Sequence, residues 1–362
     1  MPIRLERGLT QAEVKGRARL AEKKPAVAEK YELFDARVEE GKSNAIIQFQ
    51  VDYRCNFRCE HCCITGLRRS RQEESFDVGK VRDLADQADE MGLAEFVITG
   101  GEPLIIPWYD ELVEAIGPDR FYIASDTNGW YLDEKMAKHL VDIGVDKTQI
   151  SLDSLSADEH DAFRRHKGAH ERAVRGIRAS LDAGLSTLVQ TVVTRDRIRS
   201  SEFEGFLKFI NEMGAPVFVT YAKPVGAWER NYGAMVSRAD MDYMRELEEK
   251  YRVFTHLTPA YGWDLGCIAV KRMISVTQYG DVMPCPYTHI SLGNVFDESL
   301  EEIVERGMKI RHFGEHRDTC LMAEDVMARP GGFVKEYIEP RVYDKVLPVP
   351  WNQVFMDEDF IK

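Results

Sequence analysis

The chain of 362 residues is long enough for a barrel-sized domain and a smaller one, and its 44% hydrophobic and 30% charged content is typical of a globular protein. Its formal net charge of −13 argues against an extended nucleic-acid-binding surface. The first thirty residues are charged throughout and contain no apolar core of signal-peptide length, and no stretch approaches the roughly 18 apolar residues of a membrane span. We therefore expect a cytoplasmic protein with no nucleic-acid partner and no membrane span.

Residues 1–44 are polar and predict an N-terminal helical arm or cap, whereas apolar runs and amphipathic segments alternate from residue 45. The runs predict parallel strands covered on both faces, because they are near-continuously apolar or β-branched. These strands are expected at residues 45–51, 95–99, 121–125, 147–152, 186–193 and 217–221. Spacings of three and four predict helices over Val78 to Met91 and Phe203 to Ile210. Six strand–helix units are too few for a closed eight-stranded barrel, so we predict an α/β fold, a partial (β/α)6 TIM-type barrel over residues 45–254.

A small C-terminal α+β domain is predicted over residues 255–325, after a further helix around Asp240 to Tyr251. Residues 273–285 indicate a β-hairpin around Tyr279–Gly280–Asp281. Asp297 is the expected cap of a helix whose apolar face begins at Leu300. Residues 326–362 contain several prolines and aromatics, and they predict an extended tail packed on the body.

Four of the seven cysteines, Cys55, Cys59, Cys62 and Cys63, lie within nine residues among polar neighbours. In a reducing compartment such a group indicates metal or cluster ligation rather than disulfides. The C-x3-C-x2-C spacing follows the first predicted strand, and three thiolates can hold three corners of a [4Fe–4S] cluster, whereas structural zinc normally takes four protein ligands. The fourth iron would stay open for a substrate, at the strand end where barrel enzymes place their active sites.

This motif, followed by TGGEPL (99–104), SDTNGW (125–130) and SLDS (151–154) after the next three strands, resembles the radical S-adenosylmethionine (SAM) superfamily over residues 45–225. The resemblance implies that Cys55, Cys59 and Cys62 hold a [4Fe–4S] cluster whose open iron binds SAM. Reductive cleavage of SAM would then give a 5′-deoxyadenosyl radical that abstracts a hydrogen from the substrate. The family aromatic is Phe57, and the additional Cys63 is expected to be a neighbouring buried thiol.

The same resemblance implies which polar residues at the strand ends contact SAM. The turn Gly100, Gly101, Glu102 and Pro103 would bind its amino group, and Arg165 or its neighbour Arg164 would clamp its carboxylate. Further cofactor-binding candidates are Asn128, Ser151, Asp153 and Gln190. Capping and turn formation are the structural alternatives for the Ser and Asp residues. Tyr221 and Lys223 are the catalytic candidates at the barrel mouth, although core packing explains Tyr221 equally well.

The segment GCIAVKRMISVTQYGDVMPCPY, followed by LGNVFDESLEEI, resembles the SPASM and twitch auxiliary-cluster domains of radical SAM proteins. The resemblance implies that Cys267, Cys285 and Cys320 hold one auxiliary iron–sulfur cluster. Its fourth site is left between an open iron and a non-cysteine ligand among His312, His316 and Asp318. Loss of the cluster, with purely structural cysteines, is the remaining alternative.

Three functions are compatible with these motifs. The first is hydrogen abstraction from a small-molecule biosynthetic substrate, leading to oxidation, epimerisation or C–C or C–S bond formation, with the auxiliary cluster transferring electrons or anchoring the substrate. The second is a maturase of ribosomal peptides, which residues 1–44 disfavour because they are too few for the usual peptide-recognition domain. The third is an iron–sulfur electron carrier or scaffold without SAM chemistry. For the enzymatic functions, a flavodoxin or ferredoxin is the expected reductant.

Overall fold

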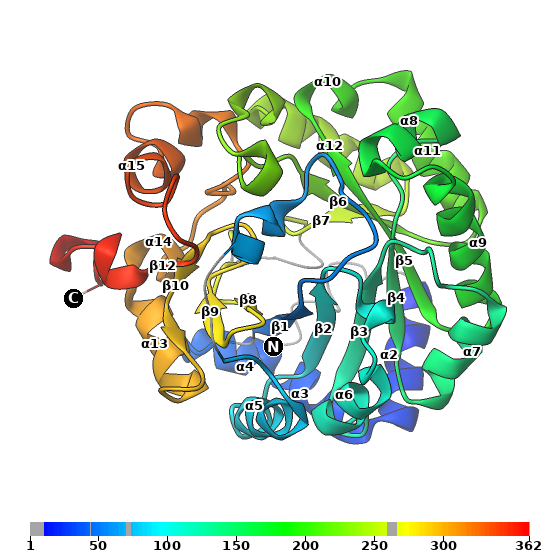
Figure 1. Cartoon of the computed structure of the whole chain (residues 1–362), viewed down its shortest axis with the longest axis horizontal. Coiled ribbons are helices and arrows are strands. Elements are labelled where there is room, and N and C mark those ends of the chain that lie inside the picture. Colours follow the sequence, from blue (N-terminus) through cyan, green and yellow to red (C-terminus); the bar gives the residue numbers. More distant parts are fainter. Residues whose placement is uncertain (1–10, 44, 70–73, 259–265, 362) are drawn as a thin grey trace.

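The computed structural model describes residues 11–43, 45–69, 74–258 and 266–361. Its core is a curved sheet with strand order β11-β9-β8-β1-β2-β3-β4-β5-β6-β7, and most of the helices lie outside it (Figure 1). The six predicted strands are β1 (Ile46–Asp52), β2 (Glu95–Gly100), β3 (Tyr122–Thr127), β4 (Lys147–Ser151), β5 (Ser186–Val193) and β6 (Val217–Tyr221). They pair in parallel and in sequence order, which confirms the partial TIM-type barrel.

The helices between these strands bury one apolar face each against the sheet. In α11, for example, Phe203, Phe206 and Ile210 are fully buried, as the three-and-four spacing predicts. The helices are α5 (Val78–Glu90), α6 (Tyr109–Ile116), α7 (Glu134–Asp142), α8 (Ala157–Arg164), α9 (Ala169–Asp182), α10 (Arg195–Ile198), α11 (Ser201–Glu212) and α12 (Arg238–Lys250). The parallel strands therefore end together at one end of the barrel, where their loops meet.

The sheet is wider than the six predicted strands. A seventh parallel strand, β7 (Val253–Thr255), pairs with β6 and spans the predicted domain boundary at residue 254; its three residues are too short to produce a periodic pattern. At the other edge, the predicted hairpin forms from β8 (Met273–Val276) and β9 (Asp281–Met283), and β8 pairs in parallel with β1. Figure 1 shows this hairpin beside β1. The two-residue β11 (Gly293–Asn294) pairs with β9 and forms the edge of the sheet. The C-terminal hairpin therefore continues the barrel sheet.

The N-terminal arm consists of α2 (Gln11–Lys23), α3 (Pro25–Glu32) and α4 (Phe34–Glu39). Lys24 Nζ lies 2.5 Å from Asp146 Oδ2, immediately before β4, and the Tyr31 hydroxyl donates to Glu95 at the start of β2 at 2.8 Å. Both anchors lie at the amino ends of the strands. The arm thus packs on the end of the barrel opposite to the loops that carry the cysteine motif.

The tail is a set of helical turns rather than an extended segment. It contains a π-helix (Val334–Ile338), α15 (Glu339–Arg341) and the short β12 (Val349–Pro350), which pairs with β10 (Ile290–Ser291). The Tyr343 hydroxyl donates to the Pro224 carbonyl at 2.5 Å, so the tail contacts the loop after β6. Among the described helices, none combines the length and apolar character that crossing a bilayer requires.

The predicted helix after the hairpin is α13 (Leu300–Lys309), but Ser299 caps it and Asp297 does not; the short α14 (Arg311–Gly314) follows. Ser299 accepts a hydrogen bond from the Glu302 amide, and Glu302 accepts one from the Ser299 amide. This reciprocal pair satisfies two free amides of the first turn, which Asp297, two residues too early, does not reach. The sequence already contains the Ser-x-x-Glu spacing of a capping box, from Ser299 to Glu302, and this spacing identifies Ser299 as the cap.

Replacing Ser299 by Ala should lower the free energy of unfolding by about 1 kcal/mol, because an N-cap side chain is lost. Urea denaturation measures this change, and amide hydrogen exchange should be faster in the first turn of α13. Asp297→Ala is the matched control, since Asp297 is exposed and lies outside the capping box. Equal effects of the two substitutions would contradict the assignment of Ser299 as the cap.

Candidate active site

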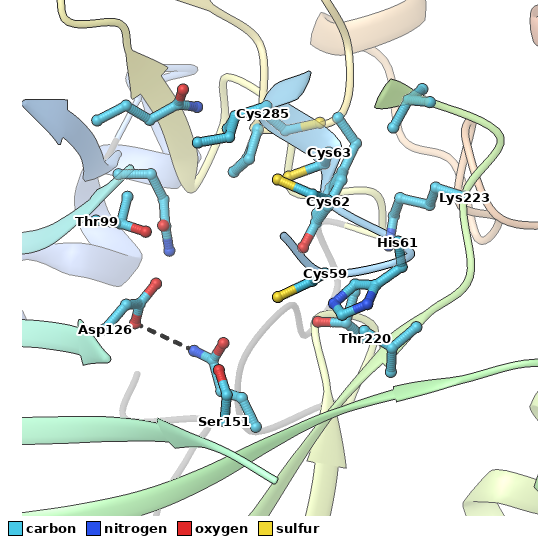
Figure 2. A pocket seen from close by; sticks show the side chains of 18 of the residues that line it. Cys59, His61, Cys62, Cys63, Thr99, Asp126, Ser151, Thr220, Lys223 and Cys285 are labelled. Carbon is cyan, nitrogen blue, oxygen red and sulfur yellow. Dashed lines mark hydrogen bonds between the residues drawn. The ribbon is translucent and has the colours of Figure 1, made fainter. Parts of the chain in front are cut away.

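A cavity of about 260 Å³ extends from the carboxyl ends of the barrel strands into the barrel, and both sets of cysteines line it. Figure 2 shows Cys59, Cys62, Cys63 and Cys285 around this cavity, with Asp126 across from them. The cysteines on its wall are Cys55, Cys59, Cys62, Cys63, Cys267, Cys285 and Cys320. The fold thus brings together two motifs that are separated by some 200 residues of sequence.

The cysteine loop after β1 presents its thiols to N–H donors. The Phe57 amide donates to Cys55 Sγ at 3.3 Å, and Arg164 Nη1 donates to Cys59 Sγ at 3.9 Å. Burial raises the pKa of both thiols. Donors aimed at sulfur stabilise thiolates, the form that binds iron, so the loop suits a cluster. Within the described part of the chain, no group of three or more His, Cys, Asp or Glu side chains is arranged to hold a single metal ion.

The glycines after β2 allow the cysteine loop to pack closely. Gly101 donates to the Asp52 carbonyl at 2.8 Å, and the Glu102 amide donates to the Arg54 carbonyl at 2.9 Å. A Cβ at Gly101 would lie 1.8 Å from the Arg54 carbonyl oxygen, so no other residue fits there without backbone movement. Gly100 and Gly101 both line the cavity, as expected of the turn.

Glu102 and Pro103, from the same turn, do not line the cavity. The Glu102 carboxylate is fully buried and accepts hydrogen bonds from Thr127 Oγ1 at 2.7 Å and the Asn128 amide at 2.8 Å. Burial raises its pKa to about 7, although these donors oppose the shift. Glu102 therefore fixes the loop after β3, which in turn presents Asn128 to the cavity.

The structure places Arg164, and not Arg165, on the cavity wall. Arg165 has φ 51° and ends α8 in the left-handed conformation. Arg164 forms a buried ion pair with Asp153, with Nη2 and Oδ2 2.7 Å apart. Although burial opposes it, the guanidinium holds the pKa of Asp153 well below its usual range. Asp153 itself does not line the cavity, whereas Ser151, two residues earlier, does.

Asp126 is a cavity residue that the sequence analysis missed. Its Oδ1 accepts hydrogen bonds from Gln149 Nε2 at 2.7 Å and from Gln190 Nε2 at 3.3 Å, and burial raises its pKa to about 6. These contacts place the predicted residue Gln190 on the cavity wall as well. The signal that points to Asp126 is its position two residues before Asn128, on the same face of an extended segment.

Lys223 lines the cavity together with the auxiliary cysteines, which are among its electrostatic neighbours. Lys223 Nζ donates to the Tyr221 carbonyl at 2.9 Å and lies 4.1 Å from the centre of the Tyr287 ring. Cys285 Sγ is 3.3 Å from Thr288 Oγ1. Tyr221 is buried, lines the cavity, and has a pKa raised by that burial.

The three proposed non-cysteine ligands of the auxiliary cluster do not line this cavity. His312 stacks edge-on against Tyr337, with ring centres 4.5 Å apart, and the Asp318 carboxylate is exposed near Arg238. His316 is also absent from the wall. Cys63 does line it, and burial beside Cys62 raises the pKa of its thiol to about 12.

The raised pKa of Glu102 makes a contribution to stability that depends on pH. The folded state holds this proton more tightly than the unfolded state, so the contribution is full below pH 4.5 and is lost as the pH rises to about 7. Relative to Glu102→Gln, the wild type should lose about 2 kcal/mol of unfolding free energy between pH 5 and pH 8. Anaerobic urea denaturation measures the difference. Glu111→Gln, at an exposed glutamate, is the control; an equally flat pH profile for both variants would contradict the assignment.

Two family models match the chain. The radical SAM superfamily matches residues 50–210, and the SPASM iron–sulfur cluster-binding domain matches residues 267–323. The first match spans β1 to α11 with the cysteine loop, and the second contains Cys267, Cys285 and Cys320.

Individual relatives agree with these models. The AdoMet-dependent heme synthase of Nitratidesulfovibrio vulgaris is 26% identical, over 74% of this chain and 80% of the relative. The mycofactocin maturase MftC of Mycobacterium tuberculosis is also 26% identical, over 70% of this chain and 68% of the relative. The structure of Streptococcus suis SuiB bound to the precursor peptide SuiA has the same fold, with a TM-score of 0.59 and 14% identity over 76% of this chain and 69% of SuiB. The chain therefore contains a radical SAM domain followed by a C-terminal SPASM iron–sulfur domain, the arrangement of an enzyme that uses SAM and a [4Fe–4S] cluster.

Proposed function

We propose that this enzyme is a peptide maturase in which Cys55, Cys59 and Cys62 hold the SAM-binding cluster. In this proposal the residues Cys267, Cys285 and Cys320 hold one auxiliary cluster. The observation that carries the proposal is that both cysteine sets line one cavity inside the barrel. A substrate in that cavity would contact both centres.

The comparisons favour a peptide substrate over the small molecule that the sequence analysis preferred. MftC is a maturase, and SuiB is seen with a precursor peptide. The short N-terminal arm was the argument against a peptide. It packs on the opposite end of the barrel through Lys24 and Tyr31, so its length has no bearing on what enters the cavity. The AdoMet-dependent heme synthase aligns with a similar share of this chain. A small-molecule substrate therefore remains the second candidate.

Two groups of residues differ in role: residues on the cavity wall would contact SAM, and residues behind the wall hold them in position. We assign the first role to Gly100, Gly101, Asn128, Ser151 and Gln190, which line the cavity at the ends of β2 to β5. Glu102, Pro103 and Asp153 lie behind this wall and act as positioning residues. With the cluster, SAM supplies the 5′-deoxyadenosyl radical that abstracts hydrogen.

Arg164 is better suited to the cluster than to the SAM carboxylate. Its Nε and Nη2 groups are committed to Asp153, and Nη1 faces the sulfur of Cys59. Since the pair with Asp153 fixes the guanidinium, its remaining donor points at a thiolate rather than into open space. Arg164 would therefore stabilise the negative charge on Cys59.

Anaerobic reconstitution of the full chain should give about eight irons if each of the two proposed ligand sets holds a [4Fe–4S] cluster. Replacing Cys55, Cys59 and Cys62 by Ala should remove about half of the iron and abolish reductive SAM cleavage. Replacing Cys267, Cys285 and Cys320 by Ala should also remove about half, while SAM cleavage continues. Iron analysis and chromatography of 5′-deoxyadenosine measure both. Cys63→Ala, at an adjacent thiol, is the control and should retain both properties; SAM cleavage by the first triple variant would contradict the assignment.

A peptide substrate should change in mass when the enzyme modifies it, and mass spectrometry measures this change. The reconstituted enzyme is incubated with SAM, a chemical reductant and peptides encoded by small reading frames beside its gene. We expect a change in mass of one peptide together with 5′-deoxyadenosine formation above the level without peptide. The triple variant of Cys55, Cys59 and Cys62 is the control and should leave the peptide unchanged. Conversion of a small molecule, with every such peptide unmodified, would instead favour the second candidate.

A further inference from the structure

Lys223 is a buried ammonium without a carboxylate partner among the described residues. Its side chain is 7% exposed, and Nζ donates to one carbonyl, that of Tyr221, at 2.9 Å. An ammonium has three protons to donate, so one carbonyl leaves most of its capacity unused. A buried charge of this kind is costly unless an anion lies close by.

The groups that face this ammonium are thiols and uncharged rings. Its electrostatic neighbours are Cys320, Cys285, Cys63 and Cys267, and the Tyr287 ring lies 4.1 Å away. His256 also lines the cavity, and burial together with the nearby ammonium lowers its pKa to about 3, so it is neutral. Lys223 and Cys285 both stand on the cavity wall in Figure 2. The anion that would complete this environment is therefore one built on the thiols.

A [4Fe–4S] cluster held by three thiolates is such an anion, and it gains one more negative charge on reduction. We propose that Lys223 is the counter-cation of the auxiliary cluster and raises its reduction potential by stabilising the reduced state. The inference rests on the proposed ligands Cys267, Cys285 and Cys320. Net charge close to a cluster is one of the levers by which proteins set its potential.

Two other buried cations near the cysteines, Arg164 and Lys271, have partners of their own. Arg164 pairs with Asp153 and reaches Cys59 of the first cluster. Lys271 lies near Cys267, but its ammonium donates to two carbonyls, those of Phe313 and Glu315. Lys223 is thus a buried cation on the cavity wall for which the described residues supply no carboxylate.

The test is a redox titration of the full-length reconstituted enzyme, followed by electron paramagnetic resonance. In Lys223→Met, the ratio of reduced to oxidised auxiliary cluster at a given potential should fall about tenfold, which is a shift of about 59 mV to more negative potential. Lys223→Arg keeps the charge and should restore most of the wild-type midpoint. The midpoint of the SAM-binding cluster should change far less in both variants.

Lys30→Met is a matched control, because Lys30 Nζ also lies 4.1 Å from an aromatic centre, that of Phe121, at the opposite end of the barrel. It should leave both midpoints unchanged. If Lys223→Met does not fold, Lys223→Gln supplies a neutral side chain that can still donate to Tyr221.

The two proposals fail in different ways. About four irons in the wild type would overturn the auxiliary ligand set, and this inference with it. About eight irons in the wild type and in the neutral Lys223 variant, with an unchanged auxiliary midpoint, would overturn the role of Lys223 alone. A shift in the neutral variant that Arg does not reverse would also overturn it, since the effect would then come from packing and not from charge.

Discussion

The pairing of β1 with β8 is the contact on which the active site depends. It aligns Ile46 with Met273 and continues to Phe49 and Val276, in a parallel register. Buried side chains reinforce it, because Gln50 Nε2 donates to Ser275 Oγ at 2.7 Å. The cysteine loop follows β1, and Cys285 follows the hairpin that β8 begins. Because β9 runs antiparallel to β8, Cys285 lies toward the start of β1, whereas the cysteine loop follows the end of β1. The two sets of thiols nevertheless line one cavity inside the barrel.

Close backbone contacts then fix the cysteine loop from a second side. A Cβ at Gly226 would lie 2.4 Å from the Cys62 carbonyl oxygen, and the Ala227 amide donates to that same oxygen at 3.0 Å. The loop after β6 therefore packs directly on the loop that carries the first three cysteines. Since Lys223 belongs to that loop, the cation beside the auxiliary cysteines and the backbone of Cys62 are positioned by one short segment.

Local patterns were sufficient for the first six strands, the cysteine motifs and the hairpin, because each depends on near neighbours in sequence; β7, with three residues, was too short to be predicted. Which of Arg164 and Arg165 faces the cavity could not be predicted from local pattern. It depends on where α8 ends, and Arg165 takes a left-handed conformation at that end. The contacts of Glu102 are not local either, since its partners Thr127 and Asn128 belong to the next strand and loop. The pairing of β1 with β8 joins residues more than 200 positions apart, which no periodicity records.

Charge is distributed over the two halves of the cavity in different ways. Next to Cys59, the guanidinium of Arg164 is neutralised by Asp153 before it reaches sulfur, so it orients the thiolate more than it adds net charge. Next to Cys285 and Cys320, the ammonium of Lys223 has a carbonyl and an aromatic face as partners, and burial lowers its pKa. In the proposed arrangement, the paired Arg164 would add little net charge beside the first cluster, whereas Lys223 would make an auxiliary cluster easier to reduce. An auxiliary cluster held there would then be suited to accept an electron.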